Sequence, residues 1–207
     1  MSSARTDPAF MPVAAAQRDV RRTFRGGFAG QVVSGALWLA SATAATWWSP
    51  RAAMLLLVVG GLFIFPLTVT LLRVMGHPAR LMPGNPLNAL GMQIAITLPL
   101  SLPVVGAATL YREAWFYPAF MIVLGAHYLP FVFLYGLRLF GVLAGVLVSA
   151  GIILGMQVPD SFSLGAWITG GVLLVFAVLG RQAVEREEGS GYAAEAASRP
   201  SREAAVV

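Results

Sequence analysis

The chain contains neither cysteine nor lysine, and it carries few charges of either sign. Without cysteine it can form no disulfide, no thiolate metal site and no cysteine nucleophile. Without lysine it can form no Schiff base with retinal or pyridoxal, and no Walker-type phosphate site. These two absences exclude several classes of enzyme and receptor before any motif is considered.

Charged residues make up 11% of the 207 residues, whereas hydrophobic residues make up 57%. A soluble domain has about a quarter of its residues charged, so this balance predicts a multi-pass membrane protein. Between Phe28 and Gly180 there are only five arginines, one glutamate and one aspartate. Because the arginines cluster at predicted membrane flanks, we attribute the sequence pI of about 10.4 to membrane orientation and expect no nucleic-acid partner.

Six windows of the sequence are long and apolar enough for a spanning helix, which needs about 20 residues. They predict an all-α bundle of six transmembrane helices. The windows are residues 27–48, 52–72, 87–110, 115–136, 139–158 and 162–180. The small, polar flanking segments lack the apolar residues needed for a core. We therefore divide the chain into a disordered tail with a basic juxtamembrane segment (1–26), a transmembrane domain (27–180) and a disordered tail (181–207).

The arginines predict the orientation of this bundle. Twelve of the fourteen lie on the side of the termini, and only Arg51 and Arg112 lie on the other side. Cytoplasmic loops carry an excess of arginine and lysine in membrane proteins. Both termini are therefore expected in the cytoplasm.

No acidic residue lies in the interior of any predicted span. Ion pumps and proton-coupled transporters usually need a buried carboxylate, and hydrolases need paired carboxylates or a metal cluster. His77, the only histidine besides His127, lies in a predicted loop, which disfavours a haem with two histidine ligands. We therefore expect a non-enzymatic protein with no metal and no cofactor.

Small residues recur at every fourth position in two similar segments, "GGFAGQVVSGAL" (26–37) and "GVLAGVLVSAGI" (141–152). This spacing allows close approach of helix backbones in lipid. The predicted helix-packing residues are Gly26, Gly30, Ser34, Gly141, Gly145 and Ser149. The likeness indicates either three helix hairpins in tandem or only the general preference of membrane interfaces for glycine and serine.

His127 lies inside the fourth predicted span, roughly 14 Å from its cytoplasmic end at 1.5 Å per residue. Thr97 lies at about the same depth in the third span, and Gln93 is one turn shallower. The candidate pocket residues are Gln93, Thr97, His127, Tyr128 and Tyr135. Two interpretations stay open: a neutral imidazole hydrogen-bonded for structural reasons, or a site that binds a ligand or a proton.

Prolines interrupt three of the predicted spans, and we expect helix kinks at Pro66, Pro99 and Pro130. A proline inside a helix leaves the carbonyl four residues earlier without its backbone partner, here those of Leu62 and Ala126. Such kinks would widen the bundle and line a cavity, as in many transporters. The alternative is that they bend the helices without function, since proline is common in membrane helices.

The segments "FPL" (65–67), "NPLN" (85–88) and "GAHYLPF" (125–131) resemble a group of uncharacterised six-helix bacterial membrane proteins. The resemblance covers residues 27–180 and implies a compact six-helix bundle in a bacterial cytoplasmic membrane, with no known activity. On glycine and proline spacing alone, the chain also resembles six-helix acid-resistance membrane proteins.

These observations favour a protein that binds, senses or moves a small neutral or lipophilic molecule through a kinked-helix pocket. The alternative is a structural or assembly subunit whose Gly/Ser helix faces dock a membrane partner or a second copy. The expected partners are thus the lipid bilayer, a small-molecule ligand and a membrane protein.

Overall fold

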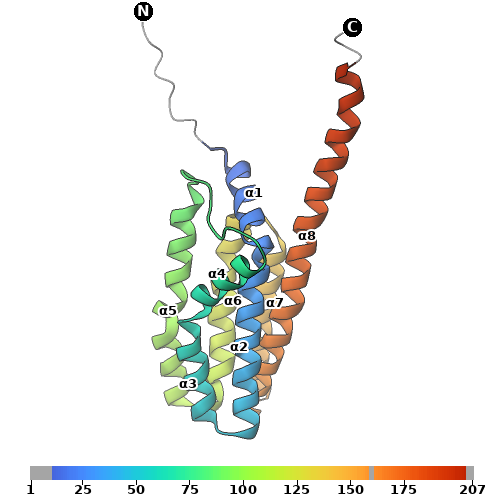
Figure 1. The fold of residues 1–207 in the computed structure, drawn as a ribbon. Helices are drawn as coiled ribbons and strands as arrows, with labels where there is room; N and C mark the ends of the chain where they lie inside the picture. Colours follow the sequence, from blue (N-terminus) through green and yellow to red (C-terminus); the bar gives the residue numbers. More distant parts are fainter. Residues whose placement is uncertain (1–10, 159–160, 204–207) are drawn as a thin grey trace, which may run out of the picture.

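The computed structural model describes residues 11–158 and 161–203, with side chains as far as Ser190. The chain forms an all-helical bundle whose long helices run side by side (Figure 1). Its elements are α1 (Val13–Thr23), η1 (Arg25–Gly27), α2 (Phe28–Trp47), α3 (Pro50–Gly61), α4 (Ile64–Val74), α5 (Leu87–Tyr111), η2 (Glu113–Trp115), α6 (Phe116–Tyr135), α7 (Leu139–Gln157) and α8 (Leu164–Glu203).

Five of these helices are long and apolar enough to cross a membrane: α2, α5, α6, α7 and α8. The remaining predicted window, residues 52–72, is not one continuous helix. It is divided into α3 and α4, which are bent by 61° relative to each other. The chain is thus an all-α protein with five candidate membrane spans, or six if the bent pair α3–α4 counts as one span.

The break between α3 and α4 follows from the local sequence. α3 ends in Gly60 and Gly61, which weaken a helix, and Pro66 has no N–H to donate to the carbonyl of Leu62. Pro66 lies in the first turn of α4, where a missing N–H costs least. By contrast, α5 and α6 are continuous helices that contain Pro99 and Pro130.

Two terminal segments differ from the sequence expectation. Residues 181–203 were expected to be disordered, but they continue α8 as a helix (Figure 1). Likewise, α1 begins at Val13, inside the expected tail, and includes part of the basic juxtamembrane segment. Both segments are held by ion pairs at one end of the bundle, where Arg21 of α1 and Arg25 of η1 contact glutamates of α8. The expectation for residues 1–10 and 204–207 lies outside the described residues.

Glycines allow the closest helix contacts. A Cβ on Gly151 of α7 would lie 2.7 Å from the carbonyl oxygen of Pro118, and one on Gly125 of α6 would lie 2.9 Å from that of Ala144. Such distances are below any normal van der Waals contact, so only glycine fits. η1, directly before α2, meets α8 in the same way where Gly26 contacts Gly180. These contacts hold α6 against α7 and η1 against α8.

The six predicted packing residues have different surroundings. Gly26 lies against Gly180, Gly30 faces Thr68 of α4, and Ser34 is buried. Gly141 lies near Val132, 3.4 Å from the position of its Cβ. Gly145 has open space around it and Ser149 is exposed, so these two do not pack helices within the described chain. The two similar segments therefore lie in different environments despite their aligned glycines.

Candidate functional site: a polar cavity beside His127

A cavity of about 140 Å³ lies in the half of the bundle nearer α1. Its walls come from α2, α4, α5, α6 and the start of α7, and no Asp, Glu or Arg lines it. The polar residues in its lining are Gln31, Ser34, Thr68, His127, Tyr128 and Tyr135. The lining thus concentrates six hydrogen-bonding side chains around one cavity in a largely apolar bundle.

His127 is hydrogen-bonded to Thr97 across the contact between α6 and α5, with 3.0 Å between Nδ1 and Oγ1. Thr97 also donates a hydrogen bond of 2.7 Å to the carbonyl oxygen of Ile94. The structure therefore joins the two residues that the depth calculation placed at one level. Gln93 does not join them: its side chain is exposed on α5, and it does not line this cavity. Phe131, one turn along α6 from His127, has an apolar side chain and so cannot form a hydrogen bond with the imidazole.

Aromatic rings form one wall of the cavity. Phe131 stacks on Tyr135 with ring centroids 5.7 Å apart, and Tyr135 lies 4.8 Å from Phe140 of α7. Tyr128 stacks on Phe140 at 6.1 Å, and the ring of His127 lies 5.2 Å from that of Phe131. Aromatic pairs at these separations attract each other beyond simple burial, so this wall is expected to be rigid.

Two buried polar atoms in the cavity lining have no hydrogen-bond partner among the described residues: Oε1 of Gln31 and Oγ1 of Thr68. Gln31 is only 3% exposed, so bulk water does not reach it freely. A buried polar atom left without a partner costs about 1–3 kcal/mol. The lining is therefore suited to an occupant that forms hydrogen bonds, either water or a ligand.

A second buried polar group in the bundle differs from this lining, because its hydrogen bonds are formed within the protein. Near the opposite end, Ser41 Oγ donates to the carbonyl oxygen of Ala53 at 2.9 Å and lies 2.6 Å from the hydroxyl of Tyr117. All three residues are fully buried. Here the protein itself supplies the hydrogen bonds, as most proteins do for buried polar groups.

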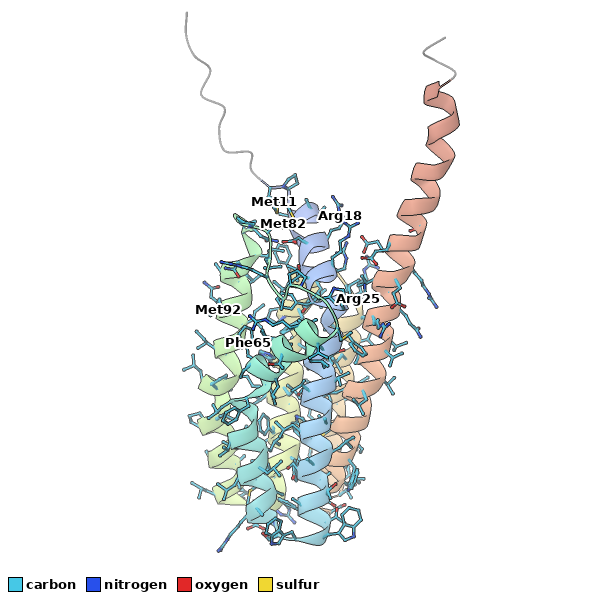
Figure 2. The ribbon with its side chains drawn as sticks, in the orientation of Figure 1. Met11, Arg18, Arg25, Phe65, Met82 and Met92 are labelled. Atoms are coloured by element: carbon cyan, nitrogen blue, oxygen red, sulfur yellow. The ribbon has the colours of Figure 1, made fainter. Side chains whose placement is uncertain are left out.

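His127 also borders three larger spaces. One, of about 230 Å³, lies between α5 and α6 and is lined by Thr97 and Pro130. The remaining two lie toward α1 and toward the α3–α4 break. The space toward α1, of about 230 Å³, lies between Val20, Phe65 and Met92. The space in the break between α3 and α4, of about 220 Å³, is lined by Phe65 as well. Figure 2 shows Phe65 on α4, on the side that faces α5. The polar cavity is thus continued by apolar space on two sides.

α1 closes the end of the bundle above these spaces and is held by charged contacts. Arg21 donates to both carboxylate oxygens of Glu187, at 2.8 and 2.7 Å, and to the carbonyl oxygen of Tyr135 at 2.6 Å. Arg25, in η1 directly after α1, lies 3.3 Å from Glu185 and 3.6 Å from Glu188 (Figure 2). We call these contacts the α1–α8 clamp.

The loop before α5 adds a second attachment for α1. Asn85 Nδ2 donates to Asp19 at 2.7 Å and to the carbonyl oxygen of Ala16 at 3.2 Å. Its Oδ1 accepts a hydrogen bond of 2.9 Å from the N–H of Leu87, the first residue of α5. The "NPLN" motif therefore both starts α5 and fastens α1.

Sequence reasoning missed several of these residues. Gln31 and Thr68 are polar residues inside apolar windows, which is a usable signal, but only the fold places them opposite His127. The clamp could have been suggested by charge complementarity between "RDVRR" (18–22) and "EREE" (185–188). Within the described ranges, no three His, Asp or Glu side chains lie close enough together to hold a metal ion.

Comparison with known proteins gives the family of the chain. Neither a curated protein nor a solved structure matches it significantly. The sequence profile of the DUF7010 family, described as a family of unknown function, matches residues 13–182. This match includes α1, the cavity and the apolar part of α8, and it covers more than half of the chain. The chain therefore belongs to the DUF7010 family.

Proposed function

We propose that this protein is a non-enzymatic, multi-pass protein of the bacterial cytoplasmic membrane that binds a small, neutral, amphipathic molecule in the cavity beside His127. In this proposal both termini lie in the cytoplasm, and binding serves to sense or move the molecule. The observation that carries it is the set of buried polar atoms without partners, Oε1 of Gln31 above all, beside a wall of aromatic rings.

The size and chemistry of the cavity support a ring-sized, uncharged group. A protein cavity of about 150 Å³ lined by apolar side chains binds benzene. The present cavity, at about 140 Å³, has similar room but adds polar atoms that can orient a bound molecule. None of the described residues that line it is Asp, Glu or Arg. An ionic ligand would therefore lose its hydration without gaining an ion pair in return. The adjoining apolar spaces offer room for a tail.

Equilibrium dialysis of radiolabelled 4-pentylphenol against the protein in lipid nanodiscs tests this proposal, with empty nanodiscs as background. We expect one saturable site in the wild type. Gly30→Leu places a side chain into the cavity, where Gly30 faces Thr68, and should weaken binding at least about tenfold. Gly145→Leu is the matched control, because Gly145 faces open space. Equal binding by both variants, with both folded, would contradict the proposal.

A second candidate function is docking of a membrane partner or a second copy. The observation that favours it is the outward position of Gly145 and Ser149 on α7. Gly26 and Ser34, from the other predicted face, are already covered within the chain. Crosslinking in native membranes tests this candidate, and finding only monomers, in the wild type as in Gly145→Leu, would rule it out.

A further inference from the structure

The tautomer of His127 can be read from its hydrogen bonds. A threonine hydroxyl has one proton, and the 2.7 Å contact with the carbonyl oxygen of Ile94 uses the proton of Thr97. The same oxygen lies 3.0 Å from Nδ1 of His127, so it must accept there. Nδ1 therefore carries the imidazole proton, and Nε2 keeps its lone pair.

The cavity thus presents two hydrogen-bond acceptors that have no partner within the described chain. One belongs to His127, on α6, which lines the cavity and whose hydrogen bond uses only Nδ1, so that Nε2 has no partner. The other is Oε1 of Gln31, on α2, which is buried. A molecule with only carbonyl or ether oxygens cannot satisfy either acceptor. A hydroxyl group can donate to one of them and accept from a tyrosine or threonine hydroxyl of the same lining.

An apolar route leads from this point toward the lipid. The space in the α3–α4 break is lined by Gly61, Leu62 and Phe65 on one side, and by Leu98 and Pro99 of α5 on the other. His127 stands at its inner end and is the polar side chain of that lining. Leu62 is 66% exposed and Phe65 is 63% exposed, so this face of the bundle lies open.

We propose that the ligand is a hydroxyl-bearing amphiphile, a phenol or an alcohol with an apolar tail. It reaches the cavity laterally between α4 and α5 and donates its hydroxyl hydrogen to Nε2 of His127. This inference rests on the function proposed above and adds the chemical class of the ligand. His127 then acts as a binding residue, with Thr97 as the residue that fixes its tautomer.

A matched pair of probes tests the class of ligand without any variant. 4-Pentylphenol and 4-pentylanisole share ring and tail, but the methyl ether has no hydrogen to donate. In wild-type protein in nanodiscs, we expect the phenol to bind about tenfold more tightly than the ether, as one hydrogen bond predicts. Equal affinity for the two probes, with loss of both in Gly30→Leu, would overturn the hydroxyl assignment while the proposed function stands. No saturable binding of either probe would overturn both.

Two variants then test which protein residues cause the preference for the phenol over the ether. His127→Phe keeps an aromatic ring and should abolish the preference for the phenol while the ether still binds. Thr97→Val should reduce the preference several-fold, because Nδ1 loses its fixed acceptor. The matched control is Thr109→Val, since Thr109 also donates within α5, to the carbonyl oxygen of Val105, and lies outside the cavity lining. A preference that survives in both His127→Phe and Thr97→Val would overturn the assignment to Nε2.

Discussion

At the scale of single residues, the bundle contains two kinds of buried polar group. Ser41 and Tyr117 bond to each other and to the backbone, so their role in the fold is complete. Gln31 and Thr68 keep a buried oxygen without a partner, although both lie in an apolar bundle. Since unpaired buried polar atoms destabilise a fold, their presence around one cavity is best explained by an occupant.

Two substitutions on α2 separate these roles. Gln31→Leu removes an unpaired polar group, so the free energy of unfolding should stay unchanged or rise, while binding of 4-pentylphenol falls. Ser41→Ala removes a partner from Tyr117 and should destabilise the protein by about 1–3 kcal/mol without changing binding. Thermal unfolding in detergent and dialysis in nanodiscs measure the two effects. The explanation fails if Gln31→Leu destabilises the protein as much as Ser41→Ala does.

At the scale of helices, the apolar windows predicted the existence of the long helices well, because length and hydropathy alone define a span. Pro66 predicted a bend in residues 52–72, but the windows alone could not predict that the helix divides there. Prolines also lie inside α5 and α6, which stay continuous, whereas the division of residues 52–72 follows Gly60 and Gly61. The charge complementarity of residues 18–22 and 185–188 was a usable signal for the clamp. Which arginine pairs with which glutamate still required the fold, because these segments are far apart in sequence.

The glycine contact between η1 and α8 gives a prediction about packing. A Cβ on Gly180 would lie 2.5 Å from the carbonyl oxygen of Gly26, whereas one on Gly171 would meet nothing within 4 Å. Gly180→Ala should therefore lower thermal stability clearly, because backbone must shift to admit the methyl group. Gly171→Ala, in the same helix, should leave stability unchanged or raise it slightly. Equal effects of the two substitutions would mean that η1 and α8 are not in this close contact.

The α1–α8 clamp gives a prediction about pH. The hydrogen bond from Arg21 holds the pKa of Glu187 below its ordinary value of 4.5. A depressed pKa means that the clamp stabilises the docked α1 fully above pH 4.5, and that this contribution is lost as the pH falls through the lowered value. Because the chain has no cysteine, spin labels at Arg18→Cys and Ser190→Cys report only this pair. We expect a narrow distance distribution at pH 7 that broadens as the pH falls through the lowered pKa, below 4.5.

The control for this pH effect is Glu187→Gln, which cannot titrate at that position. Its distance distribution should already be broader at pH 7 and should change less on acidification. A distribution that stays narrow at pH 3 in the wild type would show that α1 is held by other contacts, such as those of Asn85.

At the scale of the whole molecule, α1 and the charged part of α8 lie at one end of the bundle, and the connection between α2 and α3 lies at the other (Figure 1). Which end faces the cytoplasm stays a prediction from the positive-inside rule. The candidate site was predictable in part. The depths of Thr97 and His127 along their helices indicated a meeting point, whereas the opposite wall from α2 and α4 required the fold.

Single-cysteine labelling tests the proposed orientation. Trp48, in the connection between α2 and α3, is 83% exposed, and Ser190 is exposed on α8. In intact bacterial cells, a membrane-impermeant maleimide should label Trp48→Cys at once and Ser190→Cys only after the membrane is permeabilised. The reverse pattern would place the termini outside the cell and would refute the arginine argument.

The central claim, that the cavity beside His127 is a binding site, is tested most directly by locating a bound probe. Crystals of the protein soaked in 4-bromophenol give an anomalous signal that marks the position of bromine. The account predicts a peak inside the cavity of about 140 Å³ between Gln31, Thr68 and His127, with the phenol oxygen near Nε2. Bromine peaks confined to the lipid-facing surface, with none inside this cavity, would contradict it.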